Sequence, residues 1–278
     1  MKKNISSLFL LQSLVMLSFA QQHKNSLAKE DIKGKVRSVA QTALHRYKTN
    51  GVFGKWEAMD STVASFDTKG NQFEKKYYKA DRSFYYTYIS KYDQQQQNIE
   101  NSSNDLNGNI LGKTTYKYNS QHDLIEITEY GKDGAIRNTT SYSYADANNR
   151  EEKNYGADGL LSSTWVRKFD SKGYETDYTH RSFKVNYSTR REKKYDSKGN
   201  KTEENMYLPA ETFFMKYIYG YDVAGNCIAM HKYDAKGTLK DSNTYQYEFD
   251  KQLNWTKKTE LDENGQPFHV EQRTISYY

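Results

Sequence analysis

The sequence predicts an all-β fold: a tandem antiparallel β-hairpin meander that forms a curved or coiled sheet with little helix. Three observations predict it. Aromatic residues recur about every 26 residues, the segments around them alternate in polarity with a period of two, and Asp- and Gly-rich turns separate these segments. Because short turns make successive strands antiparallel neighbours, the pattern implies roughly 16–18 strands of about 8–9 residues each.

The composition agrees with a folded but polar chain. Hydrophobic residues make up 36% of the 278 residues and the mean hydropathy is -1.03, values that would suit a disordered protein. Aromatic residues nevertheless reach 15%, with 26 Tyr, and disordered chains are poor in aromatics. With only 2 Pro and 16 Gly, collagen-like and Pro-rich linker proteins are excluded.

Residues 1–20 have the features of a secretory signal peptide. A positively charged start precedes an apolar core at 8–19, and Ser18 and Ala20 occupy the −3 and −1 positions of a cleavage site. The apolar core is too short to span a membrane comfortably, which disfavours the alternative of a membrane anchor. We therefore expect an exported bacterial protein that begins at Gln21, is periplasmic, attached to the cell surface or secreted, and has no membrane span after cleavage.

The chain after the signal peptide divides into two parts. Residues 21–58 form an N-terminal segment, in which 31–47 is expected to be a cap strand rather than a helix because Val36 and Ala40 follow the alternation of a strand. Residues 59–278 form the β repeat domain.

Anchor aromatics, each preceding an Asp-rich turn, organise the repeat domain. Successive anchors are 26, 26, 26, 25, 26, 26 and 28 residues apart. In turns such as 196–200, the Asp side chain can accept hydrogen bonds from backbone N–H groups, and the Gly supplies a left-handed conformation. The anchors are Phe66, Tyr92, Tyr118, Tyr144, Phe169, Tyr195, Tyr221 and Phe249.

The period of two places a ladder of tyrosines on one face of the sheet. The anchors and the residues two positions before them point the same way, whereas Lys117, Lys168, Lys194 and Glu248 point to the other face. Tyrosine can pack its ring between strands while its hydroxyl stays hydrated, so the favoured interpretation of the ladder is cross-strand packing. The alternative is a stacking platform for sugars or another flat ligand. This candidate binding face consists of Tyr116, Tyr142, Tyr219, Tyr247, Tyr118, Tyr144 and Tyr221.

The charged residues give no pattern typical of nucleic-acid binding, and no nucleic-acid partner is expected. Without the two lysines of the signal peptide, the chain has 39 basic and 35 acidic residues, a net charge of +4, and the two signs are interspersed. One exception is the stretch 181–194, in which six basic residues accompany only Glu192. It could bind nucleic acid or another acidic polymer, but an ordinary charged rim is the favoured interpretation.

The sequence contains no recognisable motif for catalysis or metal binding. The six His residues include no pair at the i, i+2 or i, i+4 spacing of metal ligands, and no Gly-x-Ser-x-Gly or P-loop sequence occurs. Carboxylates are plentiful, but none stands out as a catalytic pair. The single cysteine, Cys227, cannot form an internal disulfide and is expected to be a small packed side chain. We therefore expect no enzyme activity, no catalytic residue, no metal and no cofactor.

Several of the turns share a motif. Tyr-Asp-x-x-Gly-Asn stands at 195–200 and 221–226, and Tyr-Asp-x-x-Gly at 233–237. These segments resemble the YD (RHS-type) repeats of bacterial exported and cell-surface proteins, and the resemblance covers about residues 60–278. It implies a β-sheet that coils or closes and, in large members, a hollow shell around a C-terminal toxin. The chain lacks the Asp-Pro-x-Gly-Leu element that ends such shells, so toxin delivery is not the expected role.

Two functions of different classes follow from these features. The first is an exported, non-enzymatic β-repeat protein that acts as a scaffold or surface interaction module, with a protein or polysaccharide at the cell surface as its partner. The second is a carbohydrate-binding protein that uses the tyrosine face. An outer-membrane barrel would suit the number of strands, but the sequence lacks the apolar lipid-facing band and the long loops on one side that such a barrel needs.

Overall fold

The computed structural model describes residues 25–278, so the predicted signal peptide at 1–20 lies outside the described residues. The helical elements of this part of the chain are the short helix α1 (Ser26–Lys29) and the 3₁₀ turn η1 (Pro209–Glu211). The strands are β1 (Val36–His45), β2 (Lys48–Thr49), β3 (Val52–Phe53), β4 (Glu57–Ala58), β5 (Ser61–Phe66), β6 (Gln72–Tyr78), β7 (Phe84–Tyr92), β8 (Asn98–Asn104), β9 (Ile110–Tyr118), β10 (Leu124–Gly131), β11 (Ile136–Asp146), β12 (Asn149–Gly156), β13 (Leu161–Phe169), β14 (Glu175–Ser182), β15 (Tyr187–Tyr195), β16 (Lys201–Leu208), β17 (Thr212–Tyr221), β18 (Cys227–Asp234), β19 (Leu239–Phe249), β20 (Trp255–Leu261) and β21 (Pro267–Tyr277).

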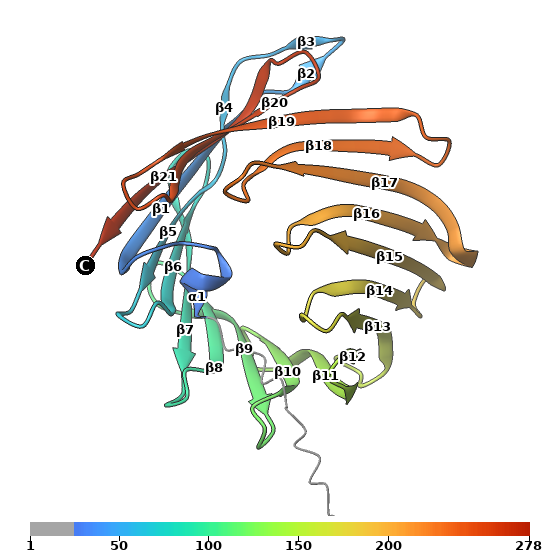
Figure 1. The fold of residues 1–278 in the computed structure, drawn as a ribbon. Coiled ribbons are helices and arrows are strands. Elements are labelled where there is room, and N and C mark those ends of the chain that lie inside the picture. Colours follow the sequence, from blue (N-terminus) through green and yellow to red (C-terminus); the bar gives the residue numbers. More distant parts are fainter. Residues whose placement is uncertain (1–24) are drawn as a thin grey trace, which may run out of the picture.

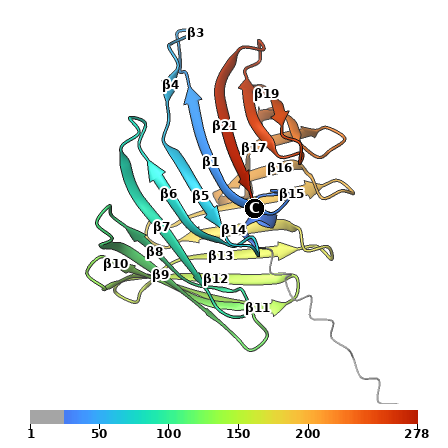
Figure 2. The ribbon, with the colours of Figure 1, turned by 90° about the vertical axis from the view of Figure 1, so that its left-hand side faces the viewer.

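Strands β1 and β5–β21 form one closed antiparallel barrel of 18 strands. From β5 to β21 each strand pairs with the next strand in the sequence, and β1 occupies the place between β21 and β5. Figure 1 shows the strands running around a ring, and Figure 2 shows β1 beside β21. The expected all-β antiparallel meander is confirmed. The sheet is not an open curved or coiled one, however, because its two ends are joined.

Strand β1 makes this closure. The strand expected within 31–47 is present, but it does not cap an open edge. It pairs with β21 along almost its whole length, from Val36 opposite Tyr277 to His45 opposite His269, and with β5 from Ser38 to Gln41. An open meander would leave two rows of unpaired backbone N–H and C=O groups, and one strand placed between the two edges satisfies both rows.

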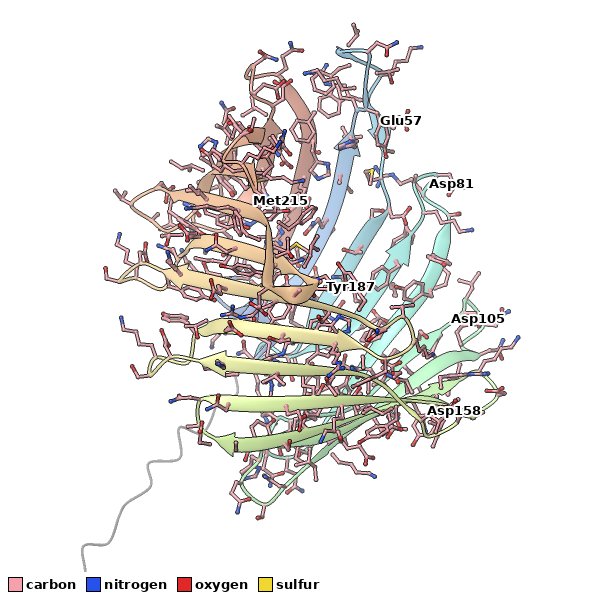
Figure 3. The ribbon with its side chains drawn as sticks, turned by 90° about the vertical axis from the view of Figure 1, so that its right-hand side faces the viewer. Glu57, Asp81, Asp105, Asp158, Tyr187 and Met215 are labelled. Atoms are coloured by element: carbon pink, nitrogen blue, oxygen red, sulfur yellow. The ribbon has the colours of Figure 1, made fainter. Side chains whose placement is uncertain are left out.

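Thirteen hairpin turns of the described chain share one five-residue geometry, in which the first N–H donates to the fifth C=O and the fourth N–H donates to the first C=O. In the turn at 196–200, Asp196 Oδ1 also accepts the backbone N–H groups of Lys198 and Asn200, each at 2.9 Å. Gly199 has a φ of +91°, the left-handed conformation that only Gly adopts without a steric cost. The turn chemistry predicted from the sequence is therefore confirmed. Figure 3 shows Asp81, Asp105 and Asp158, from three turns at one end of the barrel, one above another.

A β-bulge beside most turns gives the sheet its curvature. Ser65 pairs with Glu74 and Phe66 with Gln72, so that Phe73 is the extra residue of its strand. The same shift occurs in fourteen other hairpin or neighbouring pairs of the barrel, as between β7 and β8 at Ile99. Bulges bend a strand and increase its twist, which favours closure of a long meander. The period of the sequence did not indicate them.

The barrel has distinct inner and outer faces. Residues opposite one another in an antiparallel pair share a face, and following these pairs around the ring keeps the tyrosine ladder and the residues against α1 on the inner one. The outer face is charged: Lys117 and Lys194 expose 65% and 68% of their side chains and pair with Glu126 and Glu203 at 2.6 and 2.8 Å. The two-faced sheet expected from the alternation is thus present, with the tyrosines inside.

The inner face is not a close-packed core. In residues 25–278 the buried hydrophobic side chains are few, and the inner tyrosines are mostly only half-buried. Barrels of about 16–18 strands are too wide for their own side chains to fill. We conclude that the inner side chains remain in contact with water. The buried hydrophobic residues are Leu27, Ile32, Val36, Val39, Ala64, Phe66 and Leu261.

Six of these seven residues form one small core at the seam where the barrel closes. Leu27 and Ile32 lie in residues 25–35, which we call the N-terminal clasp, and they pack with Val39 and Phe66 of the closing strands. The clasp also bridges two turns. Leu27 N donates to the carbonyl of Gly70 at 3.2 Å, and Lys33 N donates to Asn254 Oδ1 at 2.7 Å. The clasp therefore joins the β5–β6 turn to the β19–β20 turn across the seam.

Deleting residues 196–221, one complete unit, joins Tyr195 directly to Asp222 and recreates a Tyr-Asp turn between β15 and β18. We expect a folded sixteen-stranded barrel, because every remaining strand keeps its direction and its inner face. Deleting only 196–208 removes one strand, so β21 would have to run parallel to β1 and the closing ladder would be lost. Circular dichroism and thermal unfolding compare the two; equal tolerance of both deletions would contradict the fold.

The seam core makes a second prediction. Phe66 is 1% exposed, whereas Phe73 is 44% exposed at a bulge of the next strand. Phe66→Ala should lower the free energy of unfolding by about 3–5 kcal/mol, the usual cost of emptying a buried phenylalanine site. Phe73→Ala is the matched control and should change it by less than about 1 kcal/mol. Urea unfolding measures both, and similar losses would show that the seam holds no special core.

Candidate binding face inside the barrel

The seven tyrosines of the candidate binding face all lie on the inner face, but they do not gather into one patch. Tyr116 and Tyr118 are on β9, and Tyr142 and Tyr144 are on β11. The remaining three lie on β17 and β19, on another part of the ring. The structure therefore divides them between two stretches of wall. Their chemical surroundings separate them into two rows.

The first row uses its hydroxyl groups to tie strands together. Each of these tyrosines donates to the carbonyl of the residue twenty positions earlier, which is the first residue of an earlier strand. The bonds are Tyr118 to Asn98 (2.8 Å), Tyr144 to Leu124 (2.8 Å), Tyr221 to Lys201 (2.8 Å) and Tyr247 to Cys227 (2.9 Å). Tyr92 and Tyr195 make the same bond. In the unit whose anchor spacing is 28, Tyr247 and not Phe249 makes it, so the structural anchor of that unit lies two residues before the predicted one.

The second row consists of Tyr116, Tyr142 and Tyr219, which are further from the turns. Tyr116 Oη accepts the side-chain N–H of Asn101 at 2.7 Å. The ring of Tyr142 lies 6.0 Å from the guanidinium of Arg150, and Lys201 Nζ lies 4.5 Å from the ring of Tyr219. Their side chains contact other inner side chains and leave the rings partly exposed.

Burial changes the acidity of both rows. It raises the pKa of Tyr118, Tyr142, Tyr221 and Tyr247 to about 12, because a phenolate would lose hydration inside the barrel. These hydroxyls therefore stay protonated as hydrogen-bond donors at any physiological pH. The sequence pattern alone does not predict this shift.

A network of charged side chains covers the inner face of β12–β16, and we call it the charged wall. Glu152 accepts from Arg167 Nε at 2.7 Å, and Arg167 Nη1 reaches Glu175 at 2.6 Å. Further along, Arg191 binds Glu204 at 2.6 Å. The wall contains five cations and three carboxylates, which leaves two positive charges in excess. Its members are Arg150, Glu152, Arg167, Glu175, Arg191, Lys193, Lys201 and Glu204.

Two carboxylates of this wall, Glu175 and Glu204, have a lowered pKa. Burial opposes the ionisation of Glu204, but hydrogen bonds from Lys201 and Arg191 outweigh it and lower its pKa. Burial likewise opposes ionisation of Glu175, and bonds from Lys193 and Arg167 lower its pKa. Glu175 and Glu204 are therefore ionised throughout and above the ordinary titration range of glutamate.

The basic stretch at 181–194 has many more acidic partners than its own sequence suggests. Because strand residues alternate, Arg191 and Lys193 lie on the inner face, whereas Arg190 and Lys194 lie on the outer face. Arg190 Nε donates to Asp177 at 2.7 Å from the neighbouring strand. Within the stretch these cations accompany only Glu192, but antiparallel pairing adds carboxylates from β14 and β16, 13 to 18 residues away in the sequence.

The seam also brings together two histidines that sequence spacing could not connect. His45 Nδ1 and His269 Nδ1 lie 3.3 Å apart across the β1–β21 pair, although 224 residues separate them. Among residues 25–278, no group of three or more His, Cys, Asp or Glu is placed to hold a metal ion. Cys227 is half-buried as expected, and burial raises the pKa of its thiol.

Comparisons with known proteins establish no family for this chain. No family model matches the sequence, and no curated protein matches it. The solved structures that match include TcdB2-TccC3 without its hypervariable C-terminal region, at 13% identity and a TM-score of 0.35 over 82% of this chain. This chain spans 13% of the length of that structure. Porin-like proteins from Bacteroides uniformis and Bacteroides vulgatus match at 10% identity with TM-scores of 0.34 and 0.35, over 87% and 88% of this chain and 96% and 99% of theirs. Within residues 25–278, no helix is long and apolar enough to cross a membrane.

The tyrosine pKa values predict how the barrel responds to alkali. Tyrosine in an unfolded chain has a pKa of about 10. Since Tyr118 and Tyr221 have a pKa of about 12 in the folded barrel, their contribution to stability is complete below about pH 10 and is lost as the pH rises through about 12. Tyrosinate absorbance and circular dichroism, followed together, should change in the same interval. Ionisation of most tyrosines near pH 10 in a barrel that stays folded would contradict the assignment.

Proposed function

We propose that this protein is an exported, non-enzymatic barrel that acts as a scaffold or interaction module at the cell surface. The observation that carries the proposal is the use of the ladder hydroxyls. In the first row they are bound to backbone carbonyls at 2.8–2.9 Å, so these tyrosines serve the wall rather than a ligand. A wall held in this way gives a rigid frame without a thick apolar core.

The polar outer face supports the proposal of a protein that functions in water. Its strands present cross-strand ion pairs, such as Lys91 with Glu100 at 2.7 Å and Lys257 with Glu248 at 2.7 Å. Hydroxyl side chains, such as Thr115 and Thr256, lie between the charged ones. The predicted signal peptide supports export to the periplasm, the cell surface or the medium, and membership of the YD-repeat group remains a prediction.

Carbohydrate binding is the second candidate, and a specific observation favours it. The second-row rings of Tyr142 and Tyr219 are partly exposed on the inner face, beside cationic side chains. Trp165 stacks on His180 with ring centroids 4.1 Å apart and also lies on this face. Partly exposed aromatic rings next to hydrogen-bond donors are well suited to hold sugar rings.

Thermal unfolding beside a glycan array separates the two functions. As part of the frame, Tyr221→Ala should lower stability by roughly 2–4 kcal/mol. Tyr219→Ala, two residues away, tests the second row: loss of glycan binding with an unchanged melting temperature would make carbohydrate binding the leading function.

The proposal that the protein is exported has its own test. N-terminal sequencing and surface biotinylation of producing cells should find a chain that begins at Gln21 outside the cytoplasm. An intact Met1 on a cytoplasmic protein would overturn the proposal.

A further inference from the structure

Two parts of the barrel's inner surface differ in their chemistry. The charged wall on β12–β16 holds eight acidic and basic side chains. The inner face of β6–β9, on another side of the ring in Figure 1, holds tyrosine, serine, threonine and asparagine with a single charge, Lys75. There Tyr77 and Tyr86 stack with ring centroids 4.4 Å apart. Packing alone would not require this difference in side-chain charge, since hairpins of the same kind build both walls.

The charged wall is partly open to water. Arg191 exposes 35% of its side chain, Lys201 30% and Lys193 18%. Their ion pairs with Glu204 and Glu175 hold these cations in place, so little side-chain entropy remains to be lost when a ligand binds. The two excess positive charges are consequently held in a fixed geometry in which a ligand can reach them.

Aromatic rings lie among these cations. The ring of Tyr178 has Lys193 Nζ at 5.1 Å, the guanidinium of Arg167 at 5.4 Å and that of Arg191 at 5.8 Å. Trp165 lies beside it with a centroid separation of 5.5 Å. A sugar acid offers the two features that match this arrangement: a flat C–H face that stacks on an aromatic ring, and a carboxylate or sulfate that binds a guanidinium or ammonium group.

We propose that the charged wall is a binding site for an anionic polysaccharide, a chain of sugar rings that carry carboxylate or sulfate groups. This inference rests on the carbohydrate-binding function proposed above and adds to it the charge of the ligand and the wall that binds it. The ligand supplies the negative charge that the three glutamates leave unmatched. The wall on β6–β9 contributes hydroxyl and amide groups that can contact the uncharged edges of the chain.

Neighbouring lysines on β15 provide a matched pair of variants. Lys193 lies on the inner face and binds Glu175, and Glu175 still has its ion pair with Arg167 when the lysine is removed. Lys194 lies on the outer face and binds Glu203, and Glu203 still has its ion pair with Lys216 when Lys194 is removed. Lys193→Gln and Lys194→Gln therefore change the net charge equally, and each leaves its glutamate with one cation.

Binding is measured by calorimetry with polygalacturonate and heparin, with dextran as a neutral polysaccharide and polyadenylate as a nucleic acid. We expect Lys193→Gln to weaken polygalacturonate or heparin binding about fivefold to tenfold, and Lys194→Gln to change it by less than about twofold. Affinity should fall as salt is raised. Glu175→Gln adds one excess positive charge to the wall and should tighten binding, even if it lowers the melting temperature.

Each other outcome overturns the proposal. Equal weakening by the two lysine variants would place the polyanion on the outer surface. Polyadenylate bound as tightly as the acidic polysaccharides would make the wall a general polyanion surface. If dextran binds and Lys193→Gln does not change its affinity, the carbohydrate-binding function is supported and only the inference about an anionic ligand fails. If none of the four polymers binds, both the inference and the carbohydrate-binding function fail.

Discussion

The antiparallel pairing of β1 with β21 is the constraint on which the rest of the structure depends. It joins strands from opposite ends of the described chain, and β5 completes the junction on the other side of β1. Without it the meander would end in two open edges that invite pairing with other chains. The only sizeable apolar cluster of the described residues lies at this seam, together with the hydrogen bonds of the N-terminal clasp. The tightest packing is therefore found where loop closure is most costly, between segments more than 200 residues apart.

Closure at this width also decides how the wall is stabilised. A narrow barrel can fill its interior with aliphatic side chains, but 18 strands enclose too much space. Stability must then come from contacts within the wall. The first-row tyrosines fit this need, because each spans neighbouring strands with its ring and binds a backbone carbonyl with its hydroxyl. The low hydrophobic content of the chain and its high tyrosine content are two consequences of the same geometry.

The predictable features of the fold are those that depend on local sequence. The alternation of polar and apolar residues predicted the two faces of the sheet. The Asp and Gly of turns such as 196–200 predicted the hairpins, because hydrogen bonds within five residues determine the geometry of the turn. Closure does not follow from the local pattern, since it depends on the accumulated twist and on bulges such as that at Phe73, which carry no distinctive residue type. The charged wall was missed for a related reason. Arg191 and Glu204 meet only when two strands pair in register, so a stretch that has one acidic residue among six basic ones along the chain gains further acidic partners across the sheet.

The distribution of charge between the two faces bears on function more than its total does. On the outer face, pairs such as Lys117 with Glu126 are largely exposed, and exposed ion pairs contribute little to stability. On the inner face Glu204 keeps only 5% of its side chain exposed, so its charge is costly unless it is paired. An apolar or hydroxyl side chain would suit a purely structural wall at lower cost, as the β6–β9 side of the same barrel demonstrates. The charged wall of this water-accessible interior therefore suits an ionic ligand, and its excess of cations favours the anion proposed above.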